Sequence, residues 1–116
     1  MQETLIDINV MRSAAKDACR IMKVLSNPDR LLLLCQIMQG EKCVGDLETL
    51  LGIVQPTLSQ QLGILRQEGL VLTRREGKNI YYRVSNRKVL AVMETLYEQF
   101  CPPPEPVSSR RQGIAS

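Results

Sequence analysis

Residues 43–70, with the sequence CVGDLETLLGIVQPTLSQQLGILRQEGL, constrain the fold of this chain more than any other stretch. The pattern predicts a first helix over 43–51, followed by Gly52 at the place where a helix often ends in a left-handed residue. It predicts a second helix over 55–68, with Pro56 in its first turn, where a missing N–H costs nothing. Two helices joined by a short turn that contains glycine indicate a helix-turn-helix.

Composition limits what the rest of the chain can be. Its 116 residues have room for one domain, and 44% of them are hydrophobic, which is enough for a core. No apolar run approaches the roughly 18 residues that a membrane span requires, and the first residues lack the features of a signal peptide. We therefore expect a cytoplasmic protein with no membrane partner. The absence of histidine excludes imidazole zinc sites, Ser-His and Cys-His catalysis, and histidine pH switches.

Positive charge is concentrated in residues 55–88. This segment holds seven basic and two acidic residues, although the whole chain has a net charge of only +3. Beside a helix-turn-helix, such an excess indicates that the partner is the phosphate backbone of double-stranded operator DNA. An ordinary solvated face is the alternative.

The second helix of the motif has a polar, uncharged start. Leu58, Leu62 and Leu65 form its apolar stripe, and several hydrogen-bonding side chains lie largely off that stripe. They suit a recognition helix in the major groove, because Gln pairs with adenine edges, and Ser and Thr bind bases or phosphates. For single members of this group, a role as a cap or as plain surface is the alternative. The candidate DNA-reading residues are Gln55, Thr57, Ser59, Gln60 and Gln61.

Residues 71–84 predict a two-stranded hairpin, with strands over 71–76 and 79–84. A basic hairpin that directly follows a recognition helix is interpreted as a wing. We expect its three cations, Arg74, Arg75 and Lys78, to reach phosphates or a minor groove, whose narrow stretches attract arginine.

Three more helices are expected, over 5–25, 28–38 and 87–101. The first and last have apolar stripes, which we expect to pair with the same helices of a second subunit. The expected fold class is therefore mainly α with a small β-hairpin. We expect a homodimeric winged helix-turn-helix with the element order α-α-α-α-β-β-α, in a single domain over 1–101. The Pro/Ser-rich tail, 102–116, is expected to be disordered.

The segments CVGDLETLLGIVQPTLSQQLGILRQEGLV and RREGKNIYYRV, in this order of elements, resemble the ArsR family of bacterial winged-helix repressors. The resemblance covers about residues 15–101 and implies a homodimer that blocks a promoter until an inducer binds. Metal-sensing members use a CxC pair at the start of the motif, but here Cys43 is followed by Gly45 at the second position. Their zinc site needs histidine, which this chain lacks. We therefore expect no metal site and no cofactor.

The chain has four cysteines and no CxxC pair. Cys19 and Cys35 lie in apolar stripes and are interpreted as small buried hydrophobes. Cys43 begins the first motif helix, where the helix dipole favours a thiolate. Together with Cys101 it resembles the thiol pair of the dithiol, persulfide- and redox-sensing branch of the family (BigR/SqrR/HlyU-like). The resemblance implies a cross-link between these two residues, and an incidental cap with an incidental surface thiol is the alternative.

The resulting interpretation is a transcriptional repressor, not an enzyme, that leaves its operator when a per- or polysulfide cross-links Cys43 and Cys101. One alternative is an oxidant-sensing repressor with a simple disulfide between the same residues. A sensor of arsenite or of a thiophilic metal is another. From different classes, a small thiol enzyme such as a persulfide reductase and a winged-helix protein–protein adaptor also remain, although no catalytic base or cofactor loop is visible.

Overall fold

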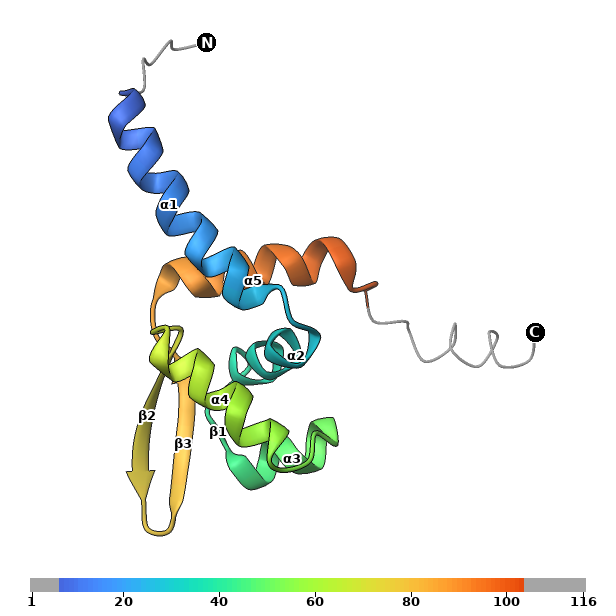
Figure 1. The fold of residues 1–116 in the computed structure, drawn as a ribbon. Coiled ribbons are helices and arrows are strands. Elements are labelled where there is room, and N and C mark those ends of the chain that lie inside the picture. Colours follow the sequence, from blue (N-terminus) through green and yellow to red (C-terminus); the bar gives the residue numbers. More distant parts are fainter. Residues whose placement is uncertain (1–6, 104–116) are drawn as a thin grey trace, which may run out of the picture.

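The computed structural model describes residues 7–103, which form five helices and a three-stranded antiparallel sheet (Figure 1). The predicted winged helix-turn-helix is confirmed, with α3 and α4 as the motif and the β2–β3 hairpin as the wing. Nearly all of the tail expected over 102–116 lies outside the described residues. The elements are α1 (Ile8–Leu25), α2 (Pro28–Ile37), β1 (Lys42–Cys43), α3 (Val44–Leu51), α4 (Thr57–Gln67), β2 (Val71–Glu76), β3 (Asn79–Val84) and α5 (Arg87–Phe100).

Side-chain caps determine where three of the helices begin. The first helix begins at Ile8 rather than at the predicted residue 5, because Asp7 is extended and its carboxylate accepts a hydrogen bond of 2.7 Å from the α1 backbone. Asn27 and Asn86 cap α2 and α5 in the same way, each accepting at 3.0 Å. Such caps satisfy N–H groups that have no partner inside the helix.

The recognition helix α4 begins two residues later than predicted. Pro56 is its N-cap, and Gln55 precedes the helix, where its side-chain oxygen accepts a 3.0 Å hydrogen bond from the Ser59 N–H. The turn before it forms as expected, because Gly52 adopts the left-handed conformation (φ 70°) and ends α3. These two boundaries fix the angle between α3 and α4.

The sheet contains one strand that the sequence pattern does not predict. The short strand β1 pairs with β3, which gives the strand order β1-β3-β2. Lys42 lies opposite Tyr82, and Cys43 lies opposite Tyr81. A strand of two residues is too short to show an alternating pattern, so only the tertiary pairing reveals it. It attaches the start of α3 to the base of the wing.

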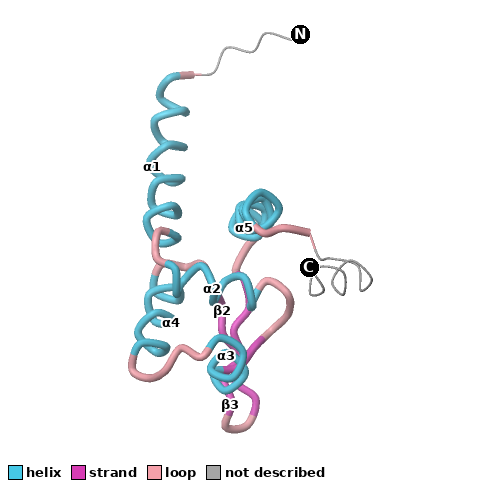
Figure 2. The backbone as a smooth tube through the Cα atoms, turned by 90° about the vertical axis from the view of Figure 1, so that its right-hand side faces the viewer, coloured by secondary structure: helices cyan, strands magenta, loops and turns pink. Residues whose placement is uncertain are grey.

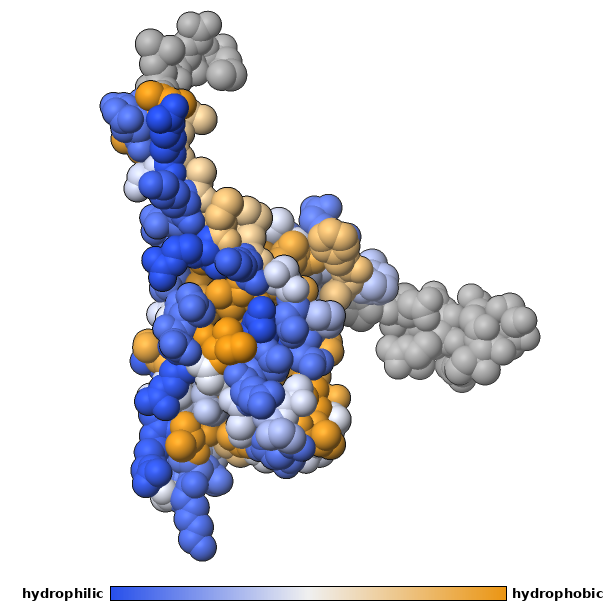
Figure 3. Space-filling view, in the orientation of Figure 1, coloured by the Kyte–Doolittle hydropathy of each residue, from blue (hydrophilic) through white to orange (hydrophobic). Residues whose placement is uncertain are grey.

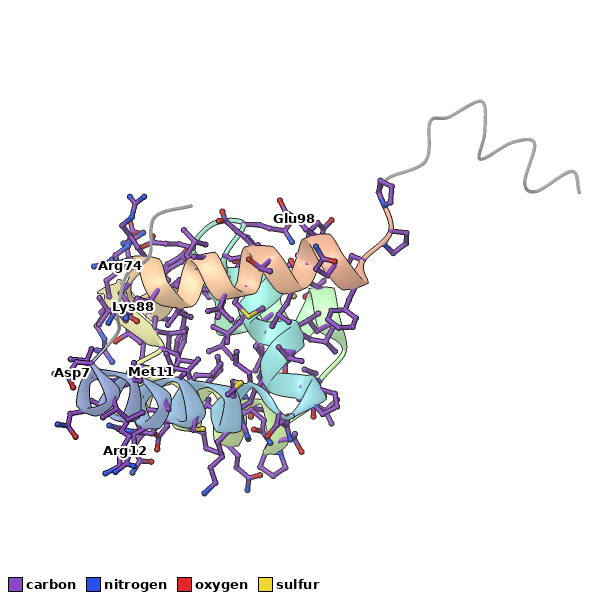
Figure 4. The ribbon with its side chains drawn as sticks, turned by 90° about the horizontal axis from the view of Figure 1, so that it is seen from above. Asp7, Met11, Arg12, Arg74, Lys88 and Glu98 are labelled. Carbon is purple, nitrogen blue, oxygen red and sulfur yellow. The ribbon has the colours of Figure 1, made fainter. Side chains whose placement is uncertain are left out.

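The core lies where α2, α3 and α4 meet the sheet and the first turns of α5. Figures 1 and 2 show α1 rising away from this body, with only Val24 and Leu25 at its C-terminal end buried. In projection from above, α1 lies along α5, with Met11 on the flank of α1 toward α5 and Arg12 on the opposite flank (Figure 4), while Figure 1 shows α1 rising steeply away from α5. None of the helices within residues 7–103 is both long and apolar enough to span a bilayer.

Candidate nucleic-acid interface and thiol sites

The recognition helix α4 has one buried and one open face. Leu58, Leu62 and Leu65 are fully or almost fully buried and anchor the helix on the core. Ser59 and Gln60 are exposed on the other side, as is Gln55 in the turn before the helix. The structure therefore presents these three polar side chains together at the start of α4. Thr57 is half-buried beside them.

Gln61 differs from its neighbours. It is half-buried, and its side-chain oxygen accepts a hydrogen bond of 2.8 Å from the guanidinium of Arg30 in α2. The same guanidinium donates to the carbonyl oxygen of Val24 in α1 at 2.6 Å. Gln61 thus faces the neighbouring helices, unlike the exposed polar side chains on α4.

Arg74 in the wing is held by acidic and aromatic neighbours. Its guanidinium lies 2.8 Å from a carboxylate oxygen of Glu41 and 3.0 Å from one of Glu76, and it stacks on the ring of Tyr81 at 4.8 Å from the centroid. The hydrogen bonds to Glu41 and Glu76 raise the pKa of Arg74 above its usual value. Because two carboxylates balance it, Arg74 adds little to the positive field of the wing.

The other two wing cations are open to a ligand. Arg75 and Lys78 are exposed, and within residues 7–103 neither lies within 4.0 Å of a carboxylate oxygen. Lys78 follows Gly77 at the tip, where Gly77 has a positive φ of 64° that favours a tight turn. The projecting wing is visible at the foot of Figure 1.

Cys101 and Cys35 lie on two neighbouring elements, the end of α5 and the helix α2. All four cysteines are free thiols. Cys19 is exposed on α1, so its interpretation as a small buried hydrophobe is wrong. Cys101 is exposed at the end of α5, and Cys35 is half-buried on α2. Burial raises the pKa of the Cys35 thiol, and the negative charge of a Cys101 thiolate raises it further. The elements that carry the two residues, α2 and α5, pack against each other.

Cys43 occupies a different part of the molecule. It lies in β1 opposite Tyr81 and is the N-cap of α3, where its N–H donates to the carboxylate of Asp46 at 3.2 Å. In Figure 1 the start of α3 lies below α2, whereas the end of α5 lies above it. The N-cap position agrees with the sequence interpretation.

Cys35 is the thiol whose neighbourhood the sequence does not reveal. Its apolar run, LLLLC, suggests an inert core position, yet it is half-buried whereas Leu33 and Leu34 are fully buried. Its position relative to Cys101 depends on how α5 crosses α2. The one local sequence signal for a special role of Cys35 is that this cysteine ends a run of leucines on a central helix.

Comparison with known proteins gives the family. Residues 27–73, which include the helix-turn-helix, match the family model described as bacterial regulatory protein, arsR family. The biofilm growth-associated repressor of Agrobacterium fabrum is 48% identical over 100 residues, which are 86% of each chain. The chain belongs to the arsR family.

Solved structures of two arsR-family relatives share the fold. The transcriptional repressor BigR from Xylella fastidiosa superposes with a TM-score of 0.77 at 44% identity, over 84% of this chain and 100% of that one. Reduced HlyU from Vibrio cholerae gives a TM-score of 0.76 at 36% identity, over 79% of this chain and 97% of that one. This arsR-family chain therefore carries the complete winged helix-turn-helix of its relatives.

Proposed function

We propose that the chain is a homodimeric, DNA-binding transcriptional repressor that is released from its operator when Cys101 is cross-linked by a per- or polysulfide. The observation that carries the sensing half of this proposal is the exposed Cys101 thiol at the end of α5, the helix that packs against α2, which carries Cys35. Cys35 is therefore our first choice as the partner thiol, and Cys43, the partner expected from the sequence, is the second. The similarity to the biofilm growth-associated repressors supports the regulatory half.

The polar start of α4 and the two unpaired cations of the wing support DNA binding. Ser59 and Gln60 offer hydrogen bonds to base edges, and Gln55, whose oxygen accepts from the Ser59 N–H, keeps its amide N–H groups for donation. Arg75 and Lys78 offer charge to phosphates. A recognition helix in the major groove with a wing on the flanking backbone uses both sets at once.

Exposed apolar side chains on α1 and α5 support a dimer. Val10, Met11 and Met22 on α1 are 47–60% exposed, and Val92 and Phe100 on α5 are 38% and 79% exposed. A groove of about 750 Å³ runs between the two helices, and Figure 3 shows hydrophobic surface along α1 and on α5 beside it. A second copy of these helices would cover this surface and place two recognition helices on one side of the DNA.

Exposure determines the order of the sulfur chemistry. Cys101 is open to solvent, so its thiolate attacks the terminal sulfur of a polysulfide, forms an S–S bond and expels a polysulfide that is one sulfur shorter. The thiolate of Cys35 then attacks the Sγ of Cys101, and hydrosulfide leaves. Two thiols are oxidised to a disulfide, and one sulfane sulfur is reduced to sulfide. A longer sulfur chain on Cys101 would leave inserted sulfur atoms in the link.

The test is binding of the full chain to the DNA upstream of its own gene, measured by fluorescence anisotropy before and after polysulfide treatment. We expect treatment to weaken binding by the wild type and by Cys43→Ser, and to leave Cys35→Ser and Cys101→Ser bound. A responsive Cys35→Ser with an unresponsive Cys43→Ser would identify Cys43 as the partner. Equal affinity of the wild type in both states would refute the switch, and failure to bind DNA would refute the repressor.

Mass spectrometry and titration separate the remaining alternatives. A link that polysulfide forms, as a plain disulfide or with inserted sulfur atoms, supports sulfur sensing, whereas a link formed only with peroxide supports oxidant sensing. A thiolate-to-metal absorption band at stoichiometric arsenite would indicate a metalloid sensor. Turnover of polysulfide beyond one equivalent per thiol pair would indicate an enzyme.

A further inference from the structure

We propose that Gln61 does not read DNA but forms, together with Arg30, a positioning contact that holds the recognition helix α4 against the end of α1. This inference rests on the proposed DNA-binding function. It gives one of the polar residues near the start of α4 a role that differs from that of its exposed neighbours.

Arg30 lies where three helices meet. Its backbone N–H donates to the capping side chain of Asn27 at 3.0 Å, its Nε donates to the Val24 carbonyl oxygen at 2.6 Å, and its Nη1 donates to Gln61 Oε1 at 2.8 Å. Val24 is in the last turn of α1, where carbonyl oxygens have no partner inside the helix and the helix dipole favours a cation. One guanidinium thus joins the end of α1, the start of α2 and the middle of α4.

The contact occupies the group that Gln61 would need for base recognition. A glutamine recognises adenine with both halves of its amide, accepting at the oxygen and donating from the nitrogen. The oxygen of Gln61 already accepts a hydrogen bond from a cation, the stronger class of hydrogen bond. Gln60, the next residue along α4, is exposed, and its side chain makes no hydrogen bond to another described residue. Gln60 is therefore free to read a base, and Gln61 is not.

The contact has a consequence for DNA recognition by the dimer. If α1 belongs to the dimer interface, the contact of Arg30 with Val24 and Gln61 fixes α4 relative to that interface. The spacing of two recognition helices then depends on it, and a small displacement of α4 is felt at both half-sites.

The test uses Gln61→Glu, with Gln60→Glu as the matched control. A glutamate at position 61 still accepts from Arg30 and is neutralised by it, so we expect the affinity for the upstream DNA duplex to stay within about twofold of the wild type. A glutamate at position 60 faces the DNA unpaired, so we expect it to weaken binding by more than tenfold. If Gln61→Glu loses more DNA affinity than Gln61→Ala does, Gln61 reads a base directly and the inference is overturned.

A double-mutant cycle completes the test. We expect Gln61→Ala and Arg30→Met each to weaken binding roughly 5- to 20-fold, the scale of one lost charge-assisted hydrogen bond, and the double variant to be no weaker than either single one. The slope of log affinity against log salt should stay unchanged in Arg30→Met, because a phosphate contact would lower it by about 1 and a positioning contact would not. If the two losses of DNA affinity add up, or if Gln61→Ala binds DNA as tightly as the wild type, the positioning role of Gln61 is overturned. The proposed DNA-binding function is not affected by either outcome. A wild-type chain that binds no duplex would overturn the proposed function as well.

Discussion

Lys78 at the tip of the wing gives the most direct test of how this chain contacts DNA. It is exposed, and among residues 7–103 no carboxylate oxygen lies within 4.0 Å of its ammonium group. A dimer brings two such lysines to the duplex. If each neutralises one phosphate, Lys78→Ala reduces the slope of log affinity against log salt by about 1.8, at roughly 0.9 per phosphate contact.

The size of the effect follows from that slope. Between 50 and 200 mM salt, the ratio of wild-type to variant affinity should shrink about 12-fold, because a fourfold change in salt is raised to the power of 1.8. Fluorescence anisotropy across this salt range, with the DNA upstream of the chain's own gene, measures it. Arg12→Ala is the matched control, because it removes the same charge from the outer flank of α1, on the side away from α5 (Figure 4). If the plots of log affinity against log salt for Lys78→Ala and for the wild type have the same slope, the phosphate contact is refuted.

Three further outcomes follow from burial and backbone geometry. Leu34 is 0% exposed, so Leu34→Ala should lower the free energy of unfolding by about 2–5 kcal/mol in a denaturant titration. Gly52 has a φ of 70°, a left-handed conformation that alanine disfavours, so Gly52→Ala should destabilise the fold by about 1 kcal/mol. Gly45 lies in α3 with open space where a Cβ would stand, so Gly45→Ala should stabilise the fold by about 1 kcal/mol. Since Cys35 is half-buried and burial raises the pKa of its thiol, its alkylation by iodoacetamide should lag behind that of the exposed Cys101 at pH 7.5, as peptide mass spectrometry can follow. Equal rates at pH 7.5 would contradict the shielding of Cys35.

Local sequence signals predict most of the fold. Asn27 before Pro28, Gly52 after an apolar helix, and Asn86 before α5 mark boundaries that the structure confirms. These signals work because a cap or a left-handed turn is satisfied by nearby backbone alone. Asp7 is a cap of the same kind, so the start of α1 carries a local signal that the apolar spacing alone misses. The strand β1 is not predictable in this way. A two-residue strand exists only because β3 lies beside it.

The candidate site is less predictable, because its residue types do not reveal their neighbours. Arg74 and Arg75 are adjacent in sequence, yet Arg74 is balanced by Glu41 from a loop 33 residues away and Arg75 is not. Gln60 and Gln61 differ in the same way, since only Gln61 turns toward Arg30. Each pair looks equivalent in the sequence, and the packing of distant elements decides which member is free to bind DNA.

Helix α2 connects the two halves of the proposed mechanism. It carries Arg30, which contacts the recognition helix, in its first turn, and Cys35, the proposed partner of Cys101, near its other end. At a rise of about 1.5 Å per residue the two positions are roughly 8 Å apart along one short helix. A cross-link can change DNA affinity only if it stabilises one position of α2 relative to α5 over another. If the switch works through α2, polysulfide treatment should lose its effect on DNA affinity in Arg30→Met even though the cross-link still forms. An undiminished response in that variant would show that the signal reaches α4 by another route.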